Sequence, residues 1–318
     1  MPPIILLWGS IFTSLFVILS FALLIWKFAP TTDWSFLLHL DYRYIALAFF
    51  LIFLYHTFDM LRLKTIAEGY KINYSYKYAY ATSLIATFGA TITPAHVGGE
   101  LIIFYMLKRL KVKPSKIWGT ILFKTVSGIS FFVLALPFFL YFLITHPGDL
   151  KKLAVLAVIF AIFSAISYPL IKWLRKYEVG GGRGRKFVRT LKLYCYAVVY
   201  FWKHNKWLFI KACLYSILLY LTFLSFAPIL LKAFHVKLPL IKIYMLELPL
   251  VYAIFSSPSP GGSGVGELGA AAIFQGLIPE SVVGLFVILW RFFSQYFSAM
   301  LGGFLFTLIV LGDLKEKR

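Results

Sequence analysis

The chain has 318 residues, of which 61% are hydrophobic and 14% are charged, and its formal net charge is +20. Soluble globular domains carry about 25% charged residues, so this composition excludes an ordinary soluble domain. Nucleic-acid-binding proteins share the positive charge but are rich in polar surface, and we therefore expect no nucleic-acid partner.

Apolar segments follow one another along the whole chain. The first is an uninterrupted apolar run, longer than the apolar region of a signal peptide, and no small-residue cleavage site follows it. The segments cover residues 4–28, 44–61, 79–107, 117–145, 153–173, 207–233, 243–278 and 282–311. The sequence therefore predicts an all-α polytopic membrane protein in which residues 1–318 form a single integral membrane domain.

The segment 79–107 is predicted to form a re-entrant hairpin of two half-helices rather than a full span. Pro94 in its middle removes a backbone donor, and the glycines at 98 and 99 favour leaving the helix. The connections on both sides, 62–78 and 108–116, are basic. The positive-inside rule places both connections on the cytoplasmic side, which a full span between them would not allow.

The segment 243–278 is broken in the same way, by a run of serine, proline and glycine. The strongly basic connection 179–206 is predicted to be an inner linker between a first half, 1–178, and a second half, 207–318. Basic residues near the C-terminus place that end inside, so the second hairpin must enter from outside. The prediction is six full spans and two hairpins in the cytoplasmic membrane of the cell, with both termini cytoplasmic.

The two halves repeat one spacing of charged and polar residues. In each half a glutamate ends the glycine-rich break, a basic residue follows after 24 positions, and a serine follows three positions later. The matching positions are Glu100 with Glu267, Lys124 with Arg291, and Ser127 with Ser294. Because the hairpins enter from opposite faces, the halves are predicted to be inverted repeats. Paired broken segments in such repeats indicate a transport site near the membrane midplane.

Charged residues inside apolar runs are rare and costly, and glycine-rich breaks expose N–H groups that can bind an anion such as phosphate. We therefore predict a transport path along these positions. Its predicted residues are Thr93, Pro94, His96, Gly99, Glu100, Lys124, Ser127, Pro260, Gly261, Gly262, Gly264, Glu267, Arg291 and Ser294. A structural alternative is that Glu100–Lys124 and Glu267–Arg291 are ion pairs that only allow charge to reside in the membrane.

Two motifs resemble the signatures of a known family. They are Thr93-Pro94…Gly99-Glu100 and Pro260-Gly261-Gly262-Ser263-Gly264-Val265-Gly266-Glu267. They resemble the flippase-like membrane domain of the lysylphosphatidylglycerol synthases. The resemblance implies a protein that moves a polar-head lipid between leaflets, either an aminoacylated or other phospholipid or a polyprenyl-linked glycolipid.

The chain also departs from that family's two-domain members. They carry a soluble aminoacyl-transferase domain after the membrane region, whereas this chain stops seven residues after Leu311. We therefore predict a stand-alone member that is not an enzyme. An arginine often precedes Gly-Glu in the first signature, whereas His96 and Val97 occupy that interval here, which leaves the head-group preference open.

Three other functions have some support in the sequence. Ser263 lies in a Gly-x-Ser-Gly string, but a nucleophilic serine needs a base and no histidine follows His235, which disfavours an intramembrane protease. An ion-coupled transporter of a small solute would use Glu100 and Glu267 as proton sites. A non-catalytic membrane partner of a lipid-modifying enzyme is the third alternative.

The remaining polar residues predict little chemistry. The histidines have no ligand spacing, and neither do Cys195 and Cys213, so we predict no metal site and no cofactor. Asp59 and Arg62 are three positions apart and are predicted to pair at a helix end. The expected partners are membrane lipids, with a separate lipid-head-group enzyme and a homodimer as further expectations.

Overall fold

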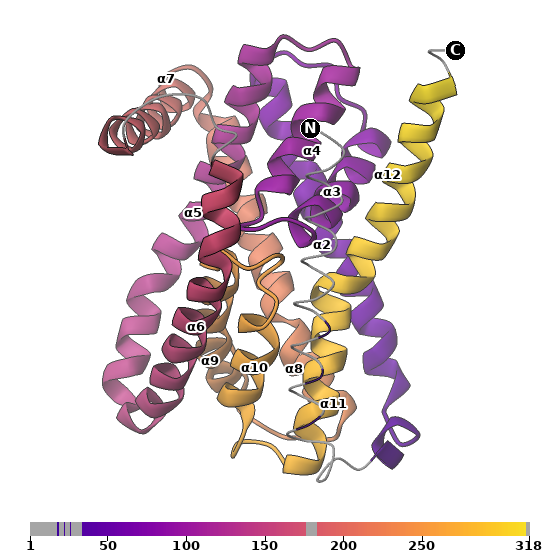
Figure 1. Cartoon of the computed structure of the whole chain (residues 1–318), viewed down its shortest axis with the longest axis vertical. Helices are drawn as coiled ribbons and strands as arrows, with labels where there is room; N and C mark the ends of the chain where they lie inside the picture. Colours follow the sequence, from indigo (N-terminus) through magenta and orange to yellow (C-terminus); the bar gives the residue numbers. More distant parts are fainter. Residues whose placement is uncertain (1–17, 19–21, 23–25, 27–33, 176–182, 316–318) are drawn as a thin grey trace.

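The computed structural model describes residues 34–175 and 183–315 and the isolated helical positions 18, 22 and 26; for residues 166–175, 183–198, 200–202, 314 and 315 it describes the backbone alone. Within these residues the chain is all-helical and has no strand (Figure 1). The first predicted span, 4–28, lies outside the described residues except at those three positions. The elements in chain order are η1 Trp34–Leu37, α2 Tyr42–Gly69, α3 Tyr76–Thr91, α4 Val97–Arg109, α5 Pro114–Thr145, η2 Pro147–Asp149, α6 Leu150–Arg175, α7 Arg183–Leu224, α8 Phe226–Ala233, α9 Leu240–Ser256, α10 Val265–Phe274, α11 Glu280–Arg291, η3 Phe292–Tyr296 and α12 Phe297–Lys315.

Four stretches of helix in the described part are long and apolar enough to cross a membrane. They are Tyr42–Gly69, Pro114–Thr145, Lys203–Ala233 and Glu280–Asp313. Each falls on a predicted full span, and the predicted span 153–173 falls on α6, a helix of 26 residues. The all-helical fold class is therefore confirmed for the described residues.

Both predicted breaks are real. The first separates α3 from α4 at residues 92–96, where Ala95 and His96 have positive φ angles. The second separates α9 from α10 at residues 257–264, where three glycines have positive φ. In Figure 1, α3 and α4 lie in the upper half of the molecule and α9 and α10 in the lower half. The two breaks meet between them, because Pro94 and Pro260 form an isolated antiparallel bridge.

Two local features were not predicted. The predicted span 282–311 contains a π-helical segment, η3, at Phe292–Tyr296, where the helix is wider by one residue per turn. The predicted linker 179–206 falls partly outside the described residues and partly on α7, which is helical from Arg183 and has non-helical dihedral angles at Asn205.

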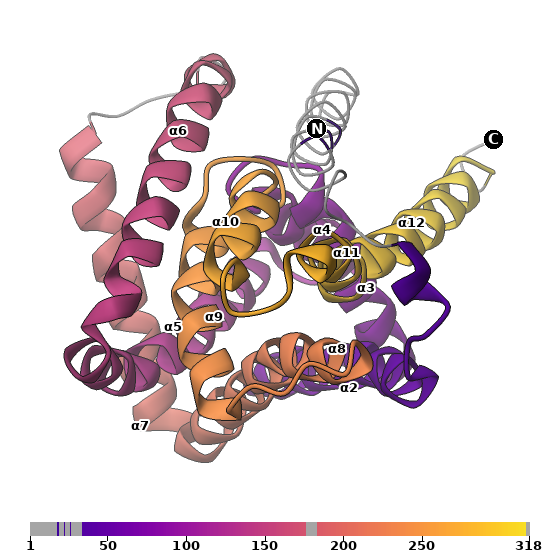
Figure 2. The same ribbon diagram turned by 90° about the horizontal axis from the view of Figure 1, so that it is seen from below.

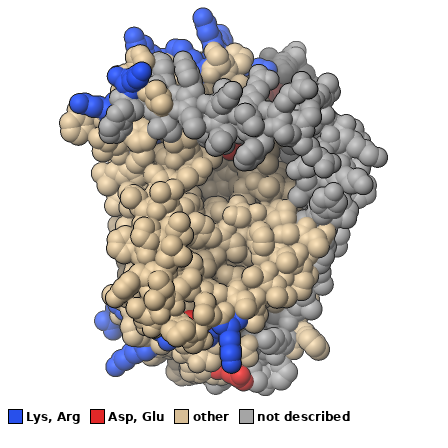
Figure 3. Space-filling view, turned by 90° about the vertical axis from the view of Figure 1, so that its left-hand side faces the viewer, with Lys and Arg blue, Asp and Glu red and all other residues tan. Residues whose placement is uncertain are grey.

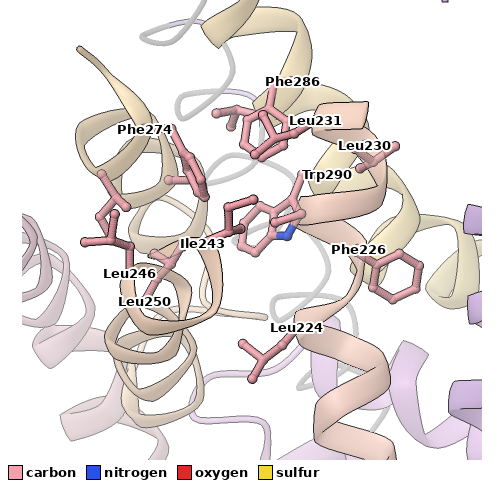
Figure 4. Close-up of a cluster of buried hydrophobic side chains, with 14 of the residues drawn as sticks. Leu224, Phe226, Leu230, Leu231, Ile243, Leu246, Leu250, Phe274, Phe286 and Trp290 are labelled. Atoms are coloured by element: carbon pink, nitrogen blue, oxygen red, sulfur yellow. The ribbon is translucent and has the colours of Figure 1, made fainter. Parts of the chain in front are cut away.

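The larger hydrophobic core surrounds α11. Trp290 of α11 is fully buried among side chains of α7, α8, α9 and α10 (Figure 4). The rings of Phe274 and Phe286 meet edge to face at 4.8 Å. Seen from below, α10 and α11 lie in the centre, and α8 lies side by side with α2 (Figure 2). This core holds the second break and the start of η3 in place.

The outer surface is apolar over a broad band. Figure 3 shows this band on the side of α5 and α6, between Lys and Arg side chains at both ends of the molecule. Phe138 and Ile144 of α5 and Val158 of α6 are among the exposed large hydrophobic side chains of these two helices. Such a surface is unfavourable in water and favourable in hydrocarbon, as expected of an integral membrane protein.

Helices of the first and last parts of the chain pack closely. α3 packs against α12, and α2 packs against α7. At Gly302 of α12 an added Cβ would lie 2.1 Å from the carbonyl oxygen of Leu84 in α3. Only glycine allows the two backbones to approach this closely.

Candidate functional site

A buried ion pair lies beside the second break. Arg291 Nε donates to Glu267 Oε1 at 2.8 Å, and both side chains are 0% exposed. Arg291 Nη2 also donates to the carbonyl oxygen of Gly261 at 3.1 Å, and the Tyr296 hydroxyl donates to Glu267 Oε1. We name these residues, with Gly264, the Glu267 cluster. The predicted pairing of Glu267 with Arg291 is confirmed.

The start of α10 positions the Glu267 carboxylate. Glu267 lies in the first turn of α10, and its Oε2 accepts from the backbone N–H of Gly264 at 2.6 Å. A carboxylate at a helix N-terminus satisfies a free N–H and interacts favourably with the helix dipole. Gly264 has a φ of +84°, which lets the loop turn its N–H toward the carboxylate. The glycine-rich break and the acid therefore form one unit.

Gly266 sets the position of the arginine. A Cβ at Gly266 would lie 2.8 Å from Arg291 Cζ and 3.0 Å from its Nε. Gly266→Ala is therefore expected to push the guanidinium away from Glu267 and to destabilise the protein by about 1–3 kcal/mol. Thermal unfolding in detergent would measure this loss. The matched control is Gly312→Ala on α12, where nothing lies within 4 Å of the new Cβ, and which should be neutral or slightly stabilising. Equal midpoints for the two variants would contradict the tight fit.

The first break contacts the second through side chains as well as through the prolines. Gln295 Nε2 of η3 donates to Thr91 Oγ1 at the end of α3, at 3.1 Å. The ring of His96 packs against the ring of Phe255 of α9, with the two ring centroids 5.5 Å apart. The predicted residues Pro94, His96, Pro260 and Gly261 are thus brought together although they lie in different halves of the chain.

Several buried polar atoms around this meeting point have no hydrogen-bond partner among the described residues. They are His96 Nδ1, Ser263 Oγ, Arg291 Nη1 and Ser294 Oγ. His96 is close enough to Arg291 to interact with it electrostatically. Buried polar groups are normally hydrogen-bonded, so these atoms are available to a water molecule, an ion or another polar group. Arginine, serine and histidine together suit an oxyanion such as phosphate.

A second charged cluster is buried between helices of both halves. Asp59 of α2 accepts from Arg62 on the same helix and from the Ser83 hydroxyl of α3, the latter at 2.7 Å. Lys124 Nζ of α5 lies 3.9 Å from Asp59 Oδ1. Arg62 Nη1 donates to Ser216 Oγ of α7 at 3.3 Å. We name these five residues the Asp59 cluster.

His56 extends the Asp59 cluster to α12. Because Ser83 donates its only proton to Asp59, His56 must donate from Nδ1 to Ser83 Oγ, over 2.9 Å. In its neutral form His56 then accepts at Nε2 from the Ser298 hydroxyl, at 2.8 Å. The chain of bonds satisfies both ring nitrogens of a fully buried histidine and ties α2, α3 and α12 together.

Two predicted pairings need correction. Glu100 forms no ion pair within the described residues; it accepts from Thr125 Oγ1 at 3.3 Å, while Lys124 pairs with Asp59. Glu100 still interacts electrostatically with Lys124. Asp59 and Arg62 do pair, but in the buried interior of α2 rather than at a helix end. Their charges are satisfied by neighbouring helices, which sequence spacing within α2 does not reveal.

The other predicted path residues have local contacts. The Thr93 hydroxyl accepts from the Gly98 N–H at 2.7 Å and donates to the Gly89 carbonyl at 2.8 Å, which closes the first break. Gly99 lies against Ala86 of α3. Ser127 donates back to the carbonyl oxygen of Lys124. Gly262 has a positive φ in the second break. These contacts shape the loops and do not by themselves identify a ligand.

Several buried polar residues of the two clusters and of α9 were not among the predicted path residues. Asp59 and Glu247 lie inside apolar segments, where an acid is rare, so a signal for both was present in the sequence. Tyr296 and Gln295 carried no comparable signal, because a tyrosine and a glutamine are unremarkable near a membrane surface. Their roles depend on the π-helical turn that carries them.

Comparison with known proteins agrees with the motif resemblance. The family model described as the lysylphosphatidylglycerol synthase transmembrane region matches residues 7–302. A UPF0104 membrane protein from Archaeoglobus fulgidus is 21% identical over 309 residues, which covers 91% of this chain and 94% of that protein. The match covers both breaks and both charged clusters.

Proposed function

Since the chain belongs to the family of the lysylphosphatidylglycerol synthase transmembrane region, a family of integral membrane proteins with a lipid-related role, we propose that it moves a phosphate-bearing lipid between the two leaflets of the cell membrane. The cargo is a phospholipid, aminoacylated or not, or a polyprenyl-linked glycolipid. In this proposal the chain is a transporter and not an enzyme. A homodimer and a separate head-group enzyme remain predictions.

The proposed topology has six full spans and two re-entrant hairpins that form inverted repeats, with both termini cytoplasmic. The direction of the helices supports it. α3 begins, and α4 ends, at the end of the molecule where α12 also ends (Figure 1). α9 begins, and α10 ends, at the opposite end of the molecule. The breaks would then meet near the midplane of the bilayer, where transporters of this architecture bind their substrates.

The observation that carries the proposal is the set of unpartnered polar atoms where the two breaks meet. A lipid head group that crosses the hydrocarbon core loses its hydration, and fixed donors must replace it. Arg291 Nη1, Ser263 Oγ and His96 Nδ1 are free to do so among the described residues. Lys124, whose side chain is 22% exposed, offers a second cation that is accessible from outside the protein core.

The shape of the apolar surface also supports a lateral path. The band on the side of α5 and α6 is hollowed below the upper basic rim (Figure 3). A lipid can keep its acyl chains in the surrounding bilayer while only its head group follows a polar path through the protein. Lys and Arg at both rims suit a lipid that is anionic in either leaflet.

A leaflet-exposure assay tests the proposal. Proteoliposomes would carry fluorescent phosphatidylglycerol or a labelled polyprenyl phosphate, and a membrane-impermeant reductant would bleach only the outer-leaflet label. Wild type should bring inner-leaflet label to the surface, whereas Glu267→Gln and Arg291→Ala should do so much more slowly. The control is Glu280→Gln at the exposed start of α11. Equal rates in all variants would contradict the site assignment, and solute uptake without lipid movement would favour an ion-coupled solute transporter.

A further inference from the structure

Glu247 is a fully buried acid that neither charged cluster uses. It lies on α9 between Leu246 and Leu248, and all three side chains are buried. Glu247 Oε1 accepts from the indole N–H of Trp290 at 2.9 Å, and Oε2 has no hydrogen-bond partner among the described residues. Figure 4 shows the apolar side chains that surround Trp290 at this place.

No ionisable side chain in the described part of the chain interacts electrostatically with Glu247. The elements that pack against α9 are α5, α6, α7, α8 and α10, and α11 adds Trp290. The ionisable groups on these elements for which the structure gives a charged or aromatic partner are engaged away from Glu247. Three form ion pairs: Lys124 of α5 with Asp59, Lys152 of α6 with Asp149, and Glu267 of α10 with Arg291 of α11. Tyr220 of α7 interacts with Arg62, and Lys232 of α8 lies over the ring of Tyr44.

An ionised carboxylate in such an apolar place, with one hydrogen-bond donor and no cation, is too costly to persist, and the group takes up a proton instead. A permanently neutral hydrogen-bond acceptor for Trp290 would be served equally well by glutamine. What a glutamate adds is the ability to release the proton. Resting on the proposed lipid transport, we propose that Glu247 is a proton-binding site whose loading and release shift α11 and, through it, the Glu267 cluster.

The connection from Glu247 to the Glu267 cluster is short. Trp290, which binds Glu247, is followed directly by Arg291, which binds Glu267. Both helices at this contact contain a feature that lets them bend. Pro249 lies inside α9, where it leaves the carbonyl oxygen four residues earlier without its usual donor. The π-helical η3 follows Arg291 immediately. A new charge on Glu247 can therefore be accommodated by a movement of Trp290 and of the turn beyond it.

Difference infrared spectra of the protein in detergent test the proton site without any lipid cargo. Wild type is expected to show the carbonyl band of a protonated carboxylic acid at neutral pH and to lose it at alkaline pH. Glu247→Gln should lack this band, Glu247→Asp should keep it at a shifted position, and Glu280→Gln, at an exposed site, should leave it unchanged. The same band in wild type and Glu247→Gln would overturn the proton site.

Two further measurements test the coupling. The emission of Trp290, taken as the difference between wild type and Trp290→Phe, should change with pH in wild type and should not change in Glu247→Gln. In proteoliposomes with fluorescent phosphatidylglycerol, an imposed pH gradient should change the wild-type rate, whereas Glu247→Gln should lose the response to the gradient. A pH-independent Trp290 emission in wild type would overturn the coupling. Absence of lipid movement with the infrared and emission results intact would instead contradict the proposed function and leave the proton site standing.

Discussion

Replacing Glu267 with glutamine is expected to destabilise the protein by about 3–5 kcal/mol, because it leaves the buried Arg291 cation without an opposite charge. Glutamine keeps the size of the side chain and can still accept a hydrogen bond, so the loss reflects charge rather than shape. Both side chains are 0% exposed, so water cannot compensate. Thermal unfolding in detergent would show the loss as a lower midpoint, and the leaflet-exposure assay would show slower lipid movement.

The double variant Glu267→Gln with Arg291→Met separates stability from function. Removing both charges of a buried pair is often nearly neutral, so the double variant should recover most of the stability lost by the single one. Lipid movement should stay lost, because the arginine that meets the head group is gone. If lipid movement returned together with stability, the pair would be structural only.

Asp59→Asn is expected to have the second-largest effect, again about 3–5 kcal/mol. It removes the carboxylate that Arg62 and Lys124 share, which leaves the buried Arg62 without an ion pair, and it weakens the bond from Ser83. The loss would appear as a lower unfolding midpoint in detergent.

Glu68→Gln on the same helix is the matched control. Glu68 is half-exposed and pairs with Lys64 at 3.5 Å, so its loss should cost less than about 1 kcal/mol. Equal losses for Asp59→Asn and Glu68→Gln would contradict the view that burial decides the strength of the Asp59 cluster.

The helices and both breaks could be predicted from the sequence because their signals are local. Apolar runs mark the long helices, and proline with glycine marks the ends of α3 and α9. The π-helical turn could not be predicted, since no local signal marks Phe292–Tyr296 and its contacts include α2 and α3, far back in the chain. The same holds for the irregular residue Asn205 within α7.

The sequence predicted the ion-pair partners in one charged cluster but not in the other. Glu267 and Arg291 lie in neighbouring elements, so a repeated spacing was enough to pair them. Lys124 finds its partner on α2, far back in the chain, and the spacing that suggested Glu100 gave the wrong partner. Long-range contacts of this kind follow from the packing of α2 against α5 and α7. The sequence shows Glu247 as an acid within an apolar segment, but it does not predict the hydrogen bond from Trp290.

The packing of α12 against α3 bears on how the protein is made. α3 ends at Thr91 and α12 begins at Phe297. The two helices pack together at Gly302, yet the ribosome synthesises most of the chain after α3 and before α12. Until α12 is synthesised, the hydrogen bond between His56 and Ser298 cannot form. The surface of α3 that packs against Gly302 is also uncovered until then. The early hairpin therefore reaches its final packing only when synthesis is nearly complete. A chain interrupted before α12 therefore leaves the Gly302-facing side of α3 without the helix that covers it.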